Sequence, residues 1–275
     1  MGPQRSGNTV TRDGTTLQYT VHGGAQSGRP GIVLVHSLAM AGIVWEAVAE
    51  QLSATAAVLT YDCRGHGASA NGPGPYRLET FAHDLADLLD SLAWNSVHLA
   101  GASMGGNVAL QFAALYPNRV LSLGLVDTTA WYGPDATAKW EQRARKAEEQ
   151  GLTGLIDFQE SRWFSDAFRS ANGEGVQRCR SVFLANEVAC FAATCRMLAA
   201  FDLRAALAGM RMPTAIVVGE DDYATPVAMA REMRAGIAAA TLKVIPKVRH
   251  LTFVECPDIV AGALSELHTR VPDGA

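Results

Sequence analysis

The strongest constraint on the fold is the alternation of short β-branched apolar runs with longer segments of helical periodicity. The run at 32–35 is uninterrupted and apolar, as expected for a strand buried on both faces. Such alternation predicts an α/β fold, with a mostly parallel central sheet flanked by helices. The expected strands are 17–21, 32–35, 57–61, 97–100, 121–126, 215–218 and 242–245.

Two segments show the apolar spacing of an amphipathic helix especially clearly. Between 78 and 92, leucine, phenylalanine and alanine recur three and four residues apart, which predicts a helix with Asp84, Asp87 and Asp90 facing water. A second helix is expected over 259–267, after Pro257, because proline suits the first turn of a helix.

The segment 130–212 interrupts this alternation. Residues 137–150 are rich in Lys, Arg and Glu, and the alanine-rich stretch 188–207 contains no strand-like run. We therefore expect a helical cap at 130–212 that lies over the sheet as a lid. The α/β core is then formed by 1–129 and 213–275. A chain of 275 residues accommodates one domain with such an insertion.

Composition excludes several classes of partner. The formal net charge is −4 and the basic residues are scattered, which argues against nucleic acid or an anionic membrane surface. No apolar window reaches the length of a membrane span, and residues 1–8 lack the apolar core of a signal peptide. The 5 cysteines contain no C-x-x-C pair, which favours free thiols in a reducing compartment. We expect a soluble, cytoplasmic protein, with a homo-oligomer possible.

One short motif predicts chemistry. Ser103 lies in Gly101-Ala102-Ser103-Met104-Gly105, between an expected strand and a helical stretch at 106–115. Small flanking residues allow a sharp strand-to-helix turn that exposes a nucleophilic serine above the sheet. An ordinary glycine-rich turn is the alternative. The sequence has no G-x-G-x-x-G, no Walker-type lysine and no H-E-x-x-H, so neither a nucleotide cofactor nor a metal is expected.

A serine nucleophile requires a base, and the base requires an acid. His250 follows the last expected strand, where the order Ser…Asp…His places the base of this topology. Asp222, in the acidic loop after 215–218, is preferred as the acid, with Asp221 and Asp127 as alternatives. His36, directly after a strand, is expected to be a structural donor near the oxyanion loop.

Acyl transfer also requires N–H donors for the developing oxyanion. The N–H of Met104, directly after the serine, is one candidate. The N–H of Leu38, in the loop after 32–35, is the other.

These residues carry a family resemblance that runs from about residue 15 to residue 267. The segment 61–69 (YDCRGHGAS), Ser103-Met104-Gly105-Gly106, and 162–164 in the cap resemble α/β-hydrolases and, within that superfamily, 3-oxoadipate enol-lactonases. The resemblance implies Asp222 as the acid, and Trp140 and Arg143 as pocket residues. The chain departs from many enol-lactonases in having His36 before Ser37, and in the segment 251–253 after His250, where these lactonases usually carry a serine.

The leading hypothesis is thus a serine hydrolase that opens a small carboxylated enol-lactone through an acyl-enzyme. A general carboxylesterase or another small-acid hydrolase is the alternative, followed by a ligand-sensing protein and a perhydrolase. A substrate carboxylate needs a cation beside an apolar pocket. Trp140 with Arg143, or Arg162 with Trp163, would supply it, unless these arginines pair on the cap surface with carboxylates such as Glu141 and Glu160.

Overall fold

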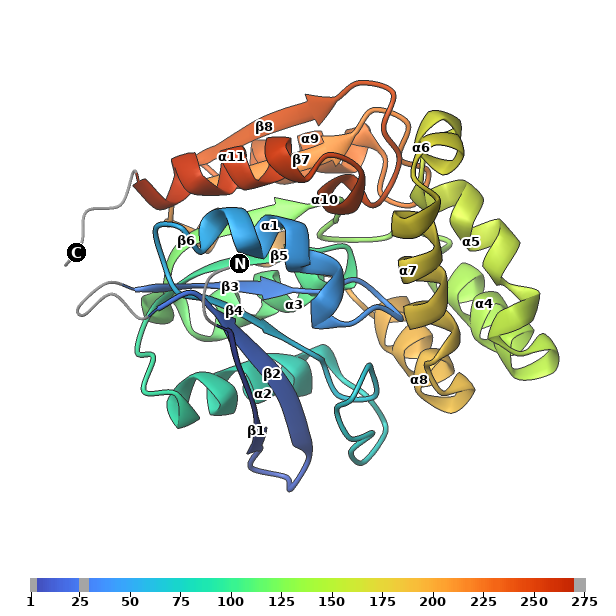
Figure 1. The fold of residues 1–275 in the computed structure, drawn as a ribbon, viewed down its shortest axis with the longest axis horizontal. Coiled ribbons are helices and arrows are strands. Elements are labelled where there is room, and N and C mark those ends of the chain that lie inside the picture. The colour runs from blue at the N-terminus through green and yellow to red at the C-terminus, as the bar shows by residue number, and fades with distance from the viewer. Residues whose placement is uncertain (1–3, 25–29, 270–275) are drawn as a thin grey trace.

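A twisted eight-stranded sheet forms the centre of the computed structural model, which describes residues 4–24 and 30–269 (Figure 1). The strand order is β1-β2-β4-β3-β5-β6-β7-β8. The pairs β1–β2 and β2–β4 are antiparallel, and every pair from β4 to β8 along the sheet is parallel. The strands are β1 (Gln4–Val10), β2 (Thr16–His22), β3 (Gly31–Val35), β4 (Val58–Tyr61), β5 (Val97–Ala102), β6 (Val120–Val126), β7 (Thr214–Gly219) and β8 (Ala240–Ile245).

Each strand expected from the sequence is present, and β1 is an additional one. Its sequence, QRSGNTV, is polar and mostly exposed. The strand is held by antiparallel pairing with β2, from Gln4 opposite His22 to Val10 opposite Thr16. Residues 1–3 of the polar N-terminal segment, and residues 270–275 of the expected core, lie outside the described residues.

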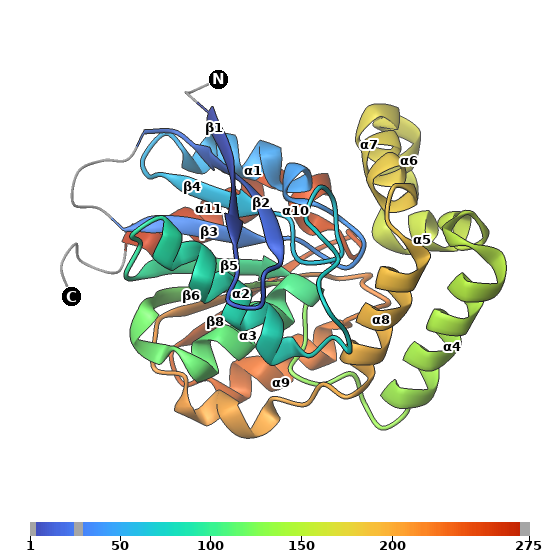
Figure 2. The same ribbon diagram turned by 90° about the horizontal axis from the view of Figure 1, so that it is seen from below.

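Helices cover both faces of the sheet (Figures 1 and 2). Alternate residues of β3 enter different cores, because successive side chains of a strand point to opposite faces. Val33 and Val35 belong to the core that includes buried residues of 78–89, 104–113 and 230–233, whereas Ile32 and Leu34 belong to the core that includes buried residues of 48–52 and 260–264. These helices are α1 (Glu46–Leu52), α2 (Leu78–Ser91), α3 (Met104–Leu115), α9 (Val227–Gly236), α10 (Thr252–Glu255) and α11 (Pro257–Thr269).

One expectation for α2 is wrong. Asp84 does not face water but is buried, and its carboxylate accepts a hydrogen bond from Arg64 Nε at 2.6 Å. Arg64 is itself 1% exposed, so the two charges compensate each other inside the protein. Asp87 pairs with Arg12 at the surface, and Asp90 is exposed. Helical periodicity alone did not show that an arginine from a distant loop would reach Asp84.

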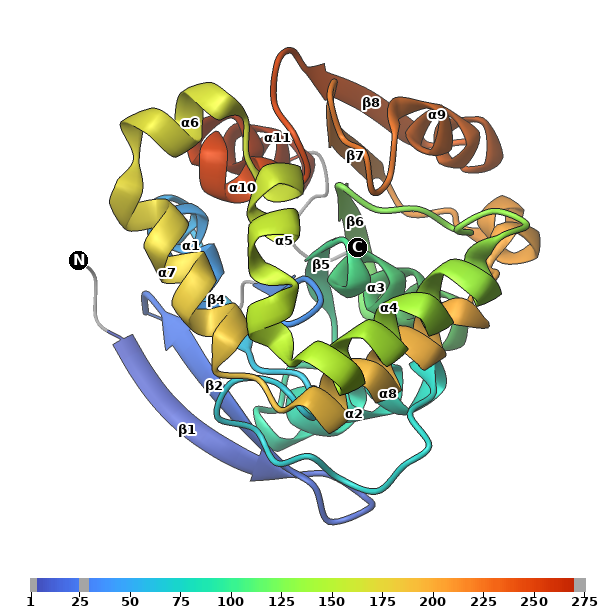
Figure 3. The same ribbon diagram turned by 90° about the vertical axis from the view of Figure 1, so that its right-hand side faces the viewer.

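The chain between β6 and β7 is helical and lies beyond the carboxyl ends of the parallel strands (Figures 1 and 2). In Figure 3 these helices face the viewer. They are α4 (Ala136–Gln150), α5 (Ile156–Trp163), α6 (Asp166–Ala171), α7 (Gly173–Leu184) and α8 (Val188–Ala199). We refer to residues 130–212 as the cap.

Within residues 4–24 and 30–269, no single helix is long and apolar enough to cross a membrane. Helices α7 and α8 reach that length and composition only as a pair, which is bent by 94° at the break between them.

Candidate active site

Ser103 lies at the sharp turn between β5 and α3. Its φ of 53° is in the left-handed region, which is strained for a residue with a side chain. The turn is close-packed, since a Cβ on Gly105 would lie 2.2 Å from the carbonyl oxygen of Val35 and 2.5 Å from that of His36. The glycine therefore lets the start of α3 approach the loop that follows β3.

Three side chains from separate strand ends form a continuous chain of hydrogen bonds. Ser103 Oγ lies 2.9 Å from His250 Nε2, and His250 Nδ1 lies 2.8 Å from Asp222 Oδ2. Because an ionised carboxylate only accepts hydrogen bonds, the proton of the neutral imidazole belongs on Nδ1. His250 Nε2 is then free to accept the hydroxyl proton of Ser103.

Asp222 is fixed in place by the loop that carries it. Its Oδ1 accepts hydrogen bonds from the backbone N–H groups of Ala224 and Thr225, and its Oδ2 accepts one from Thr225 Oγ1. Burial by itself would raise the pKa of Asp222, but the facing His250 and the hydrogen bonds from Thr225 hold that pKa below its usual value. Asp222 therefore remains a carboxylate oriented toward the imidazole.

The two alternative acids are placed elsewhere. Asp221 is exposed. Asp127 is buried, but its carboxylate accepts hydrogen bonds from the Thr252 backbone at 2.9 Å, from Thr252 Oγ1 at 2.7 Å and from Gly219 N at 3.2 Å. Burial, reinforced by the negative charge of Asp222, raises the pKa of Asp127 well above its usual value. Asp127 thus joins β6, β7 and α10, and its hydrogen bonds are with Gly219 and Thr252 and not with the imidazole.

The loop after β3 presents a free peptide N–H. The carbonyl oxygen of Ser37 accepts hydrogen bonds from Met40 N at 3.0 Å and from His36 Nδ1 at 2.8 Å. In a trans peptide the N–H of the next residue points the opposite way, so the Leu38 N–H is directed away from these partners. Within the described part of the chain, neither this N–H nor that of Met104 donates a hydrogen bond to another group.

The ring of His36 is present as one tautomer and fixes this loop. Its Nε2 accepts a hydrogen bond from Cys63 N at 2.9 Å, so the proton resides on Nδ1, which donates to Ser37. Complete burial lowers the pKa of His36 to about 4, which keeps the ring neutral near pH 7. His36 therefore fixes the orientation of the Ser37–Leu38 peptide through the Ser37 carbonyl.

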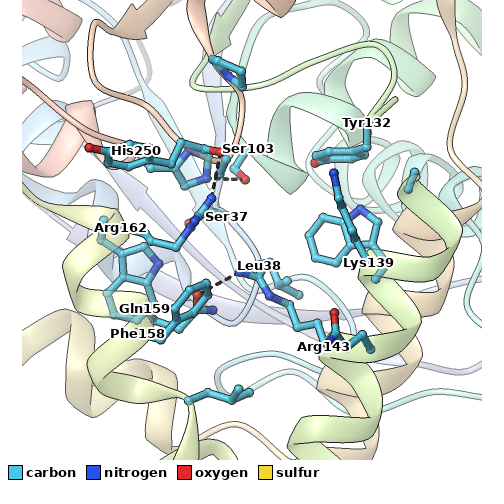
Figure 4. A pocket seen from close by; sticks show the side chains of 18 of the residues that line it. Ser37, Leu38, Ser103, Tyr132, Lys139, Arg143, Phe158, Gln159, Arg162 and His250 are labelled. Carbon is cyan, nitrogen blue, oxygen red and sulfur yellow. Dashed lines mark hydrogen bonds between the residues drawn. The ribbon is translucent and has the colours of Figure 1, made fainter. Parts of the chain in front are cut away.

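A cavity of about 680 Å³ opens in front of Ser103, between the core and the cap (Figure 4). Its size suits a small organic ligand. Its walls include the side chains of Leu38, Trp140, Phe158 and Trp163. Of the described residues that line it, none is Asp or Glu, whereas four are cationic: Lys139, Arg143, Lys146 and Arg162.

Arg143 faces this cavity from α4 and has no carboxylate partner among the described residues. Its Nη2 donates to Gln159 Oε1 at 3.1 Å, and its guanidinium lies 5.1 Å from the centre of the Trp140 ring. The carboxylates that could have neutralised it are paired elsewhere, because Glu141 binds Arg145 and Arg196, and Glu160 binds Arg180. Desolvation lowers the pKa of Arg143, as expected for a partly buried cation without a counter-ion.

Arg162 is placed differently. Its Nη2 donates to the backbone carbonyl of Tyr223 at 2.8 Å, and its guanidinium stacks on the exposed rings of Phe158 and Tyr223. It thereby connects α5 of the cap to the loop that carries Asp222.

The sequence did not predict several residues that line the cavity, because no motif marks residues that meet only when the cap folds over the core. These residues are Lys139, Lys146, Phe158, Gln159 and Tyr223.

Comparison with known proteins agrees with this architecture. A family model described as the alpha/beta hydrolase fold matches residues 30–257. The chain belongs to the α/β hydrolase fold family. Within this family it is 30% identical to 3-oxoadipate enol-lactonase 2 of Acinetobacter baylyi, over 96% of this chain and 97% of that protein.

Solved α/β hydrolase structures are also similar. The enol-lactonase from Burkholderia xenovorans superimposes with a TM-score of 0.91 at 29% identity, covering 96% of this chain and all of that one. A thermophilic esterase from Thermogutta terrifontis superimposes with a TM-score of 0.88 at 27% identity, covering 98% of this chain and 99% of that one. The chain is therefore similar to both lactone-opening and ester-cleaving enzymes.

Proposed function

We propose that this α/β hydrolase cleaves a small carboxylated lactone or ester through an acyl-enzyme, with 3-oxoadipate enol-lactone as its substrate. The observation that carries the proposal is the hydrogen-bonded chain of Ser103, His250 and Asp222 at the edge of a cavity whose lining has four cationic residues and no Asp or Glu among the described residues. The similarity to 3-oxoadipate enol-lactonases supports this choice of substrate.

In the first half-reaction, Ser103 Oγ attacks the lactone carbonyl carbon while its proton passes to His250 Nε2. The π electrons of the carbonyl move to its oxygen, which the N–H groups of Leu38 and Met104 stabilise as an oxyanion. Asp222 stabilises the imidazolium that forms. When the intermediate collapses, the ring oxygen leaves with the proton from His250, and the opened enol stays attached as part of the acyl group.

In the second half-reaction, His250 takes a proton from water while the water oxygen attacks the acyl carbon. The new tetrahedral intermediate then expels Ser103 Oγ, which regains its proton from His250. The products are the free serine and an open-chain acid with one additional carboxyl group. Each step keeps the proton on the path between Ser103, His250 and the reacting oxygen.

Trp140 and Arg143 are proposed to bind the carboxylate that the substrate already carries. A guanidinium held against an aromatic ring, without an acidic neighbour, is a strong donor to a carboxylate in a low-dielectric cavity.

We propose that the protein acts in a reducing compartment such as the cytoplasm. Its free thiols support this location; they are Cys63, Cys179, Cys190, Cys195 and Cys256.

Steady-state kinetics of Arg143→Ala on two substrates tests this proposal. The change should lower kcat/KM for the anionic enol-lactone at least tenfold, which corresponds to a loss of about 1.5–3 kcal/mol of transition-state stabilisation. The kcat/KM for p-nitrophenyl butyrate should stay nearly the same. Arg145→Ala is a matched control, because Arg145 is on the same helix, is exposed and pairs with Glu141. Equal losses on both substrates would show that Arg143 only supports the cap. An unchanged kcat/KM on both would favour a general carboxylesterase.

A further inference from the structure

The C-terminus of α5, a cap helix, is bonded to residues of the core. The last carbonyl groups of a helix have no partner within that helix. The carbonyl oxygens of Ser161 and of Phe164, which follows α5, each accept a hydrogen bond from Arg249 Nη1 at 2.8 Å. The carbonyl oxygen of Trp163 accepts one from Leu251 N at 3.0 Å. Two core residues, separated by a single position, therefore supply donors to the end of this helix.

The residue between these two donors is His250, the base of the candidate active site. In the part of the chain that the structure describes, the backbone N–H of His250 donates to no other group. The core holds the segment at its ends, through the carbonyl oxygen of Val248 and the N–H of Thr252. Between these ends the cap holds it, through Arg249 and Leu251. The backbone of His250 is therefore placed by its neighbours and their contacts with the cap.

The link through Arg249 depends on its side chain, unlike the backbone donor of Leu251. This side chain is 17% exposed, and its Nη1 also lies 3.1 Å from Asp166 Oδ1 of α6. The negative end of a helix dipole favours a guanidinium at the C-terminus, and hydrogen bonds from a charged donor are stronger than those between neutral groups. Helix α5 also lines the cavity, with residues that include Phe158 and Arg162. Arg249 therefore connects the cap wall of the cavity to the residue next to the base.

We propose that Arg249 is a positioning residue, which holds His250 at the distance from Ser103 that proton transfer requires. This inference rests on the proposed acyl-enzyme chemistry. The described residues that line the cavity do not include Arg249, so its effect on the reaction is through the imidazole. The imidazole takes the Ser103 proton in the first half-reaction and a proton of water in the second. Since every ester or lactone requires both transfers, the contribution of Arg249 does not depend on a substrate carboxylate, whereas that of Arg143 does.

Arg249→Met, assayed on the enol-lactone and on p-nitrophenyl butyrate, tests the inference. Methionine keeps an apolar stem and removes every donor. We expect kcat to fall by about 10- to 100-fold on both substrates, because a displacement of about 1 Å between reacting groups can cost a factor of about 100. KM should change by less than about threefold, because the cavity lining is unaltered.

Arg249→Lys tests whether a charged donor is what matters. Arg249 reaches both helix carbonyls through one nitrogen, Nη1, and an ammonium group also offers several N–H donors from one nitrogen. The lysine variant should therefore keep kcat within about threefold of wild type. An equal loss of kcat in the lysine and methionine variants would contradict the proposed role.

Ser165→Ala is the matched control for attachment of the cap. Ser165 Oγ also links the cap to the core, by a hydrogen bond to Glu255, but this contact does not flank His250. The variant should lower the melting temperature and retain kcat. If Arg249→Met keeps wild-type kcat on both substrates, or if Ser165→Ala loses as much kcat as Arg249→Met, the positioning role is wrong.

Labelling of Ser103 by a fluorophosphonate separates this inference from the proposed function. A wild-type protein that is neither labelled nor active overturns the acyl-enzyme chemistry and the role of Arg249 together. Labelled, active wild-type protein with an equally active Arg249→Met overturns the role of Arg249 alone.

Discussion

Asp127 and Asp222 show how two buried carboxyl groups at neighbouring strand ends acquire different properties. Asp222 faces His250, which favours its charged form, whereas Asp127 accepts three hydrogen bonds but has no cation beside it. The pKa of Asp222 is accordingly lowered and that of Asp127 is raised. Only Asp222 is placed to orient the imidazole.

We expect Asp222→Asn to lower kcat by about 10⁴, because an amide in place of the carboxylate no longer holds the Nδ1–H tautomer of His250. Asp127→Asn should keep kcat within about tenfold of wild type and mainly lower stability, because one amide oxygen cannot accept from all its donors. Kinetics and thermal unfolding of both variants test this. The reverse ranking of kcat would make Asp127 the acid.

At the residue scale, the sequence was most informative where a residue's role depends on its place at a strand end. Ser103, Asp222 and His250 each follow an apolar run, so their convergence was predictable from the order of the strands. The cap residues were not predictable in this way. Whether Arg143 was free or bound to Glu141 depended on Arg196, which reaches Glu141 from another helix.

At the scale of elements, the turn between β5 and α3 depends on glycine. A Cβ at position 105 would meet two backbone carbonyls that cannot move without disturbing β3. We expect Gly105→Ala to destabilise the protein by more than about 2 kcal/mol and to lower kcat. Gly173→Ala, at the start of α7, is the control, because an added Cβ there meets nothing within 4 Å. Urea unfolding measures the difference, and similar stabilities for the two variants would refute the close packing.

Strand β1 shows which elements the sequence does not predict. Apolar periodicity identifies elements that bury side chains, and the parallel strands were found for that reason. The residues of β1 are mostly exposed, and pairing of its backbone with β2 holds it in place. Backbone hydrogen bonds do not depend on side-chain type, so a polar edge strand has no apolar signature. The sequence also did not show where the cap helices begin and end, because charged residues such as those of α4 occur in helices and in loops alike.

At the scale of the whole molecule, two buried histidines make stability dependent on pH. Burial lowers the pKa of His36 to about 4 and that of His66 to about 3, against 6.5 for an exposed histidine. Between pH 6.5 and 4 the unfolded chain therefore binds more protons than the native protein. The stability that depends on these two neutral histidines is fully present above this window and is lost as the pH decreases through it.

For His36 alone the expected loss of unfolding free energy is about 3 kcal/mol across that window. Urea unfolding of wild type and His36→Gln between pH 7 and pH 4.5 measures it. The variant should lose less stability than wild type over the same interval, because glutamine does not titrate. Identical pH dependence in both proteins would mean that His36 is not buried as a neutral ring.

The most direct test of the proposed chemistry is the kcat of Ser103→Ala for ester or lactone hydrolysis, measured on protein shown to be folded. Removal of the nucleophile should lower kcat by about 10⁴- to 10⁶-fold, with the melting temperature close to that of wild type. A variant that retains more than about a tenth of the wild-type kcat would contradict the assignment of Ser103 as the nucleophile.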